Sequence, residues 1–161
     1  MFKGKGTYLL FLSIIFVWFL LIFLAPLFAS LGGVFDLPSQ IIYLIFRPFC
    51  HQIPERSFFL FGYPLGVCAR CFGIYFGLLI SALIYPKIKK VDNLKFPKIH
   101  WMLLALAPLA IDGITQLVGL RESTNLLRLT TGFIFGYVLL FYIVPAYNKT
   151  VKSIKARYFS K

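Results

Sequence analysis

The segment YLLFLSIIFVWFLLIFLAPLFA, residues 8–29, carries no charged side chain anywhere along its length. A helix needs roughly 20 consecutive apolar residues to cross the hydrocarbon layer of a bilayer. The apolar core of a signal peptide is shorter, at roughly 7–15 residues. We therefore interpret this segment as an uncleaved membrane anchor, although Lys3 and Lys5 precede it, and we predict that the chain folds in a bilayer.

The rest of the chain has the same apolar character. Its 161 residues are 60% hydrophobic and only 14% charged, and a soluble domain of this length cannot hide so much apolar surface. Three more segments, at about residues 67–85, 99–120 and 126–147, are long enough to span. We predict an all-α membrane protein, a four-transmembrane-helix bundle that forms a single integral membrane domain over residues 1–161.

The lysines predict the orientation of this bundle. They precede the first span, separate the second from the third, and follow the fourth, at Lys3, Lys5, Lys87, Lys89, Lys90, Lys95, Lys98, Lys149, Lys152, Lys155 and Lys161. The positive-inside rule places all three regions in the cytoplasm, with both termini inside. The net charge of +12 therefore indicates membrane-flanking lysine rather than a nucleic-acid partner.

The other two connections carry arginine instead of lysine. Arginine on the outer face opposes the positive-inside rule, so a specific contact should hold it there. The residues are Arg47, Arg56, Arg121 and Arg128, with Arg70 just inside the second span. Arginine forms forked hydrogen bonds to carboxylate or phosphate. Pairing with nearby acids and contact with lipid headgroups both explain these arginines.

Residues 30–66, between the first two spans, are too numerous for a simple turn. They include IIYLIFRPF (residues 41–49) and SFFLFGYPL (residues 57–65), which are apolar but too short to span. We predict a folded extracytoplasmic cap that contains short interfacial or re-entrant helices.

All three cysteines lie close together in the sequence, at Cys50, Cys68 and Cys71, and His51 follows the first of them. Cys68 and Cys71 are three residues apart, so they share one face of a helix. If the cap folds onto the start of the second span, the four side chains form a set that suits tetrahedral zinc. Iron and copper also accept sulfur-rich ligands. His51 is either a ligand or an outer partner, with water, Glu55 or a substrate in the fourth position.

Two other roles are open to these cysteines. Free cysteines in apolar helices are often small buried hydrophobes. Cys68 and Cys71 also begin a helix beside Arg70, which favours thiolates and a membrane thiol–disulfide oxidoreductase. Such enzymes generally relay electrons through a second cysteine pair, and only Cys50 remains here. We therefore prefer metal binding.

A second polar group lies in DGITQ (residues 112–116), RESTN (residues 121–125) and RLTTG (residues 128–132). An acid at the depth of Asp112 is costly unless it is paired, and Arg70 or Arg128 is the predicted partner. The group is either a polar clasp or a pocket for an anionic ligand, formed by Arg56, Arg70, Asp112, Gln116, Arg121, Asn125 and Arg128. Small residues four apart, at Gly73 and Gly77 and at Gly132 and Gly136, predict close packing of the second and fourth spans. This packing would make the cysteines and the arginines one site.

The phrases C-H-Q-x-P-E-R-S-F, C-A-R-C-x-G-I-Y-x-G and D-G-x-T-Q…R-E-S-T-N…R-x-T-T-G resemble the signature of an uncharacterised family of small prokaryotic membrane proteins, a domain of unknown function. The resemblance extends from Cys50 to Gly136. It implies that the cysteines, His51, Pro54 and the polar group above belong to the defining set of the family. It also implies a multi-pass protein of a prokaryotic inner or plasma membrane, and it brings no established activity.

These patterns predict a zinc-binding membrane protein with an arginine pocket for a small anion or an anionic lipid headgroup. One alternative is a metal-dependent membrane enzyme, in which Glu55 or His51 is the general base and the metal activates water. The other alternative is the oxidoreductase that uses Cys68 and Cys71. The sequence does not indicate an oligomeric state.

Overall fold

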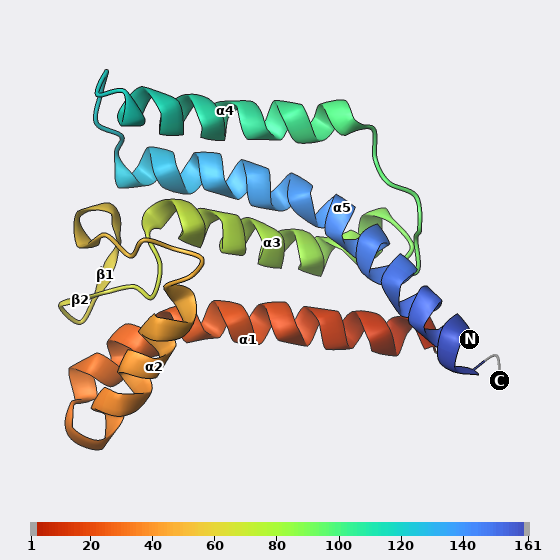
Figure 1. Cartoon of the computed structure of the whole chain (residues 1–161), viewed down its shortest axis with the longest axis horizontal. Coiled ribbons are helices and arrows are strands. Elements are labelled where there is room, and N and C mark those ends of the chain that lie inside the picture. Colours follow the sequence, from red (N-terminus) through yellow and green to blue (C-terminus); the bar gives the residue numbers. More distant parts are fainter. Residues whose placement is uncertain (1–2, 160–161) are drawn as a thin grey trace.

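A computed structural model describes residues 3–159 of the chain. It contains four long helices, drawn side by side in Figure 1: α1 (Lys3–Leu31), α3 (Ala69–Ile88), α4 (Ile99–Leu117) and α5 (Asn125–Phe159). All four are long and apolar enough to cross a membrane, which agrees with the predicted helical class. Helix α3 packs between α1 and α5, and α4 packs on α5.

Helix α4 ends at Leu117, although the predicted span continued to residue 120. Gly119 has a positive φ of 73°, a backbone conformation that stops an α-helix. The N–H of Gly119 bonds to the carbonyl of Gln116, and the N–H of Leu120 bonds to the carbonyl of Thr115. These two bonds satisfy the last carbonyls of the helix and turn the chain toward α5.

Helices α3 and α5 are in direct backbone contact. A Cβ atom at Gly132 would lie 2.3 Å from the carbonyl oxygen of Arg70, and one at Gly136 would lie 2.1 Å from that of Ile74. Glycines of α3 meet α5 in the same way, at Gly73 and Gly77. Since no side chain fits at such distances, glycine alone permits this approach, as the spacing of small residues predicted.

The region between α1 and α3 is a folded cap. It contains two 3₁₀ turns, a short helix and a small antiparallel hairpin: η1 (Gly33–Phe35), α2 (Asp36–Phe46), η2 (Pro54–Arg56), β1 (Phe59–Leu60) and β2 (Tyr63–Pro64). The predicted short helix is therefore present in the first apolar segment, whereas the second forms a hairpin. Phe61 and Gly62 both have positive φ, at 55° and 82°, as a two-residue hairpin turn requires.

The cap packs onto one end of α1. Phe46 and Val67 are fully buried there against Ile22. The Gln52 amide donates hydrogen bonds to the carbonyl oxygens of Tyr43 and Gly66, at 2.9 and 2.8 Å. These contacts fix the path of the chain on both sides of Cys50, and we call this the cap end of the molecule.

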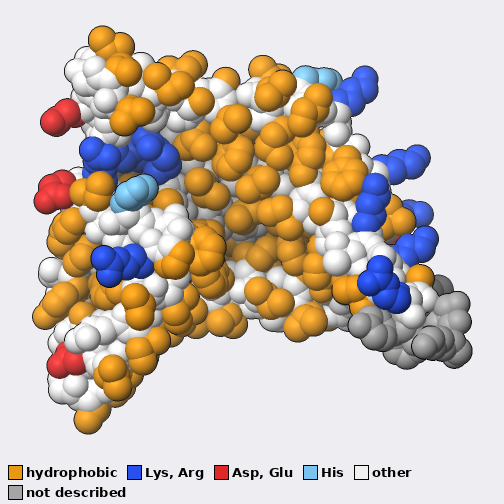
Figure 2. Space-filling view, viewed as in Figure 1, with side chains coloured by type: hydrophobic (Ala, Val, Ile, Leu, Met, Phe, Trp, Pro, Cys, Tyr) orange, Lys and Arg blue, Asp and Glu red, His pale blue; other side chains and the backbone are white. Residues whose placement is uncertain are grey.

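The opposite end, which we call the lysine end, carries exposed lysines in the α3–α4 connection, at Lys89, Lys90, Lys95 and Lys98. Asn148 of α5 holds that connection, because its side-chain amide donates to the carbonyl oxygens of Val91 and Asn93. Figure 2 shows basic side chains at both ends of this face and an apolar surface between them. The polar groups of the chain are therefore concentrated at the two ends.

Candidate metal centre and arginine pocket

The three cysteines meet where the cap joins α3. Cys50 follows the turn after α2 and is buried, Cys68 is the residue before the first turn of α3, and Cys71 lies in that turn. Their Sγ atoms all lie within 4.8 Å of one another. Tetrahedral zinc with bonds of about 2.3 Å holds its sulfur ligands roughly 3.8 Å apart. The three sulfurs are thus close enough to bind one metal ion after small adjustments.

The other two side chains that the sequence connected with this centre lie apart from the sulfurs. His51 is exposed and does not belong to the group of ligand atoms within 4.8 Å. Glu55 is also exposed and lines the arginine pocket described below. The structure therefore brings together three of the four predicted metal ligands.

Backbone amides point at the Cys50 sulfur. It accepts N–H groups from Cys68 at 3.1 Å and from Gln52 at 3.4 Å. Such donors stabilise negative charge on sulfur, which a metal-bound thiolate requires. Gln52 adopts a positive φ of 51°, and its side chain ties down the loop. Sequence reasoning assigned Gln52 no role, since the only signal was its place two residues after Cys50.

Hydrogen bonds among the thiols divide their protons unequally. The hydrogen bond from Cys50 is the largest cause that lowers the pKa of Cys68, and the same interaction raises the pKa of Cys50. A metal ion binds thiolates and displaces protons from thiols, so metal binding to this cluster would weaken as the pH falls.

Asp112 is the centre of the second polar group. Its side chain is 2% exposed, and it pairs with Arg70 through one oxygen and with Arg121 through the other, at 2.9 Å. The predicted pairing with Arg70 is confirmed, and the alternative pairing with Arg128 is wrong. Arg121 takes that place because α4 ends early and the chain folds back, so that its Nε also reaches Thr115 at 3.1 Å.

Arg128 is 6% exposed, and its guanidinium is only partly satisfied. Its Nη1 donates to the side-chain oxygen of Asn125 at 2.7 Å, whereas its buried Nε has no partner. Among residues 3–159, no carboxylate lies within ion-pair distance of Arg128. Arginine in an apolar bundle normally has such a partner. The Nε of Arg128 is therefore a buried donor without a partner among the described residues.

Arg128 lines a pocket of about 670 Å³ between the cap and the ends of α4 and α5. The pocket is lined by Ile53, Glu55, Arg56, Gln116, Gly119, Arg121, Glu122, Ser123 and Arg128. Arg70 and Asn125 do not line the pocket themselves. Arg70 pairs with Asp112, which also binds Arg121, and Asn125 accepts a hydrogen bond from Arg128. We call this cavity the arginine pocket.

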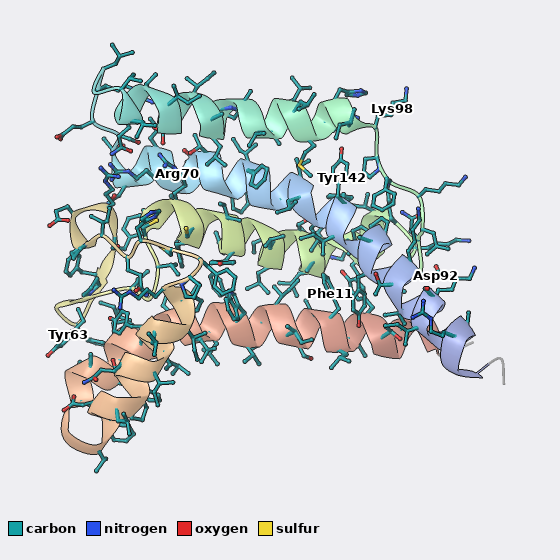
Figure 3. The ribbon with its side chains drawn as sticks, viewed as in Figure 1. Phe11, Tyr63, Arg70, Asp92, Lys98 and Tyr142 are labelled. Carbon is teal, nitrogen blue, oxygen red and sulfur yellow. The ribbon has the colours of Figure 1, made fainter. Side chains whose placement is uncertain are left out.

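The metal centre and the arginine pocket are neighbours. Arg128 interacts electrostatically with Cys68 as well as with Arg56 and Arg70. The contact between Gly132 and the Arg70 backbone aligns the first turns of α3 and α5. Figure 3 places Arg70 at the cap end, far from Asp92 and Lys98 at the lysine end. The two groups therefore occupy one end of the molecule, as the glycine spacing led us to expect.

The chain matches the family described as "Predicted membrane protein (DUF2085)" over residues 50–142, which include every cysteine and both partners of Asp112. It belongs to the DUF2085 family. This confirms the predicted kinship with an uncharacterised family of membrane proteins, and with the four apolar helices it fits a multi-pass membrane protein.

The chain is similar to two archaeal proteins. The uncharacterized protein MJ1492 of Methanocaldococcus jannaschii is 49% identical over 150 residues, which cover 91% of this chain and 96% of the relative. An uncharacterized protein of Methanothermobacter thermautotrophicus is 42% identical over 91 residues, which cover 56% of this chain and 80% of the relative. No solved structure matches the chain. Archaeal relatives agree with a prokaryotic membrane location.

Replacing the buried acid should destabilise the protein strongly. Asp112→Asn leaves Arg70 and Arg121 without their shared carboxylate. We expect a loss of about 3 kcal/mol, at the lower end of the range for broken buried pairs because both arginines retain some solvent contact. Thermal unfolding of the detergent-solubilised protein measures this loss. Asp92→Asn, at an exposed position, is the control, and an equal effect of the two substitutions would contradict the role of Asp112.

Proposed function

We propose that this DUF2085 protein binds a zinc ion through Cys50, Cys68 and Cys71 and binds an oxyanion in the adjacent arginine pocket. The observation that carries the proposal is the approach of three sulfurs to within 4.8 Å. Backbone N–H donors to Cys50 support it, since they match the charge of a thiolate ligand. Sulfur-rich ligation favours zinc over hard cations, with iron and copper as alternatives.

The metal joins two parts of the fold. Cys50 belongs to the cap, whereas Cys68 and Cys71 belong to the start of α3. A metal bound to all three therefore pins the cap to the helix bundle. The fourth position is filled by His51 after a rearrangement of its exposed side chain, by water, or by a ligand that enters from the arginine pocket.

The arginine pocket suits an oxyanion because its positive charge is incompletely balanced. Arg121 already shares Asp112 with Arg70, but Arg128 offers an unpaired Nε edge and Arg56 has no carboxylate partner among the described residues. A guanidinium edge binds carboxylate or phosphate through two parallel hydrogen bonds. The ligand is a small anion or the headgroup of an anionic lipid, and the bilayer is the other partner.

We also infer that the lysine end faces the cytoplasm, with both termini inside and the cap outside. The basis is the positive-inside rule, applied to the exposed lysines of the α3–α4 connection. A fluorescent protein that matures only in the cytoplasm, fused after Lys161, should give full fluorescence. The same reporter inserted between Gly32 and Gly33 of the cap should stay dark, and the reverse pattern would contradict this orientation.

Purified protein should contain about one zinc per chain, measured by elemental analysis together with thiol counting. Cys68→Ser should lose most of this metal, because it removes one of only three sulfur ligands. Ser153→Cys in a Cys68→Ser background is a matched control, since Ser153 is exposed in the C-terminal part of α5 and restores the number of thiols without restoring the cluster.

Three freely alkylated thiols and no metal would overturn the metal centre. A reversible disulfide between Cys68 and Cys71 in metal-free protein would instead support the oxidoreductase, in which case reduction and oxidation should interconvert two stable forms.

Arg128→Gln should weaken binding of inorganic phosphate at least tenfold, because it removes the charge and the open fork from the pocket. Equilibrium dialysis of the zinc-loaded protein with radiolabelled phosphate measures this effect. Arg47→Gln is the control, since Arg47 is exposed and lies outside the arginine pocket. Equal phosphate affinity in the two variants would show that Arg128 does not bind the anion.

A further inference from the structure

We propose that the metal centre controls the arginine pocket: zinc at the cysteines strengthens phosphate binding at Arg56 and Arg128, and phosphate strengthens zinc binding in return. This inference rests on the proposed function, because it requires both sites to bind their ligands. The two sites are coupled, and Asn125 transmits the coupling between them.

The first step in the coupling is the short segment that follows Cys50. It forms a tight turn, in which the N–H of Arg56 bonds to the carbonyl of Ile53 at 3.0 Å and the N–H of Ser57 bonds to that of Pro54 at 2.9 Å. The Ser57 hydroxyl closes the turn by donating to Ile53 at 2.8 Å. These bonds hold residues 53–57 together, and the bond from the Gln52 N–H to the Cys50 sulfur links the adjacent residue to the cluster, so fixing Cys50 restrains Arg56 and Ser57.

The second step is Asn125, at the start of α5. Its amide nitrogen donates to the backbone carbonyl of Ser57 at 3.2 Å, and its amide oxygen accepts from Arg128 Nη1 at 2.7 Å. One side chain therefore connects the cap to Arg128, which lines the pocket. Asn125 is a positioning residue, because it reaches the anion only through Arg128.

The third step is the energy needed to assemble the pocket. Burial disfavours the charge of Arg128, Arg56 and Arg70 repel it, and Asp112 and Cys68 attract it. With no anion bound, the cap segment that carries Arg56 gains by moving away. Zinc at Cys50, Cys68 and Cys71 opposes that movement and keeps the pocket in its binding conformation. Less of the binding free energy of the anion is then lost in assembling the pocket. Coupling of this kind is reciprocal by linkage.

Phosphate is the chemical class that fits two arginines lining one pocket. A single fork satisfies the two oxygens of a carboxylate, whereas Arg56 and Arg128 line one pocket and neither has a carboxylate partner among the described residues. A phosphate group has oxygens for both. Free inorganic phosphate and the headgroup of a phospholipid supply the same group, and the experiment separates these sources.

The test uses the full chain in a sugar-headgroup detergent that contains no phosphate, in a zinc-loaded and a chelator-treated form. One arm titrates inorganic phosphate, and the other titrates phosphatidylglycerol added to the micelles. We expect zinc to tighten binding about tenfold, within the usual range of coupling between sites, in the arm that contains the natural source. Binding in the lipid arm alone identifies a headgroup site.

Asn125→Asp tests the route, because it retains the oxygen that accepts from Arg128 and removes the N–H that reaches Ser57. The new carboxylate beside Arg128 lowers phosphate affinity in both forms, so the readout is the ratio of the two affinities. The ratio of affinities with and without zinc should fall below about twofold, while zinc content stays near one per chain. Asn148→Asp is the matched control: it makes the same chemical change in the same helix, at the lysine end. Asn148→Asp should leave the ratio of affinities with and without zinc unchanged. If a general loss of stability caused the effect of Asn125→Asp, Asn148→Asp would lower this ratio as well.

The outcomes separate the inference from the function on which it rests. Phosphate affinity that is equal with and without zinc overturns the coupling and leaves both sites in place. Failure of both the zinc-loaded and the chelator-treated form to bind phosphate or lipid overturns the coupling together with the proposed pocket. An undiminished ratio in Asn125→Asp overturns the route through Asn125.

Discussion

The contact between the backbones of α3 and α5 is the constraint on which the rest of the structure depends. At Gly132 and Gly136 an added Cβ atom would lie 2.3 and 2.1 Å from carbonyl oxygens of α3, so the helices approach as closely as their backbones allow. The first turn of α3 carries Cys71 and Arg70, and the first turn of α5 carries Arg128. A wider separation would part the sulfurs from the arginine pocket and leave charged side chains facing hydrocarbon.

The cap completes both sites from one stiff segment. Cys50 supplies the third sulfur, and Arg56 and Ser57, a few residues later, supply a pocket arginine and the carbonyl that holds Asn125. Gln52 lies between them and hydrogen-bonds to two carbonyls of the cap. Buried amide contacts of this kind resist displacement, because leaving a buried polar group unpaired is unfavourable. The cysteine cluster and the arginine pocket therefore share residues of the same cap segment.

The distribution of charge explains how a bundle this apolar tolerates such a site. Asp112 balances two arginines at once, which leaves Arg128 held only by an amide oxygen. In a medium of low polarity, an ionised group without a counter-charge is expensive to bury. Among the described residues, Arg128 is therefore a buried charge of this site that has no ion-pair partner.

Local patterns in the sequence were sufficient for the helical class, the four apolar helices, the approach of α3 and α5, and the gathering of the three cysteines. Each follows from hydropathy, from the spacing of small residues, or from ligand types crowded into a short stretch. Only the tertiary structure decided that residues 57–65 form a hairpin, that Arg121 rather than Arg128 pairs with Asp112, that His51 lies outside the sulfur cluster, and that Gln52 and Asn125 hold the cap. The physical reason is that these outcomes depend on competition among several partners of similar chemistry. The partner that forms the contact is determined by where a helix ends and by which turn the backbone adopts. Residue spacing alone specifies neither.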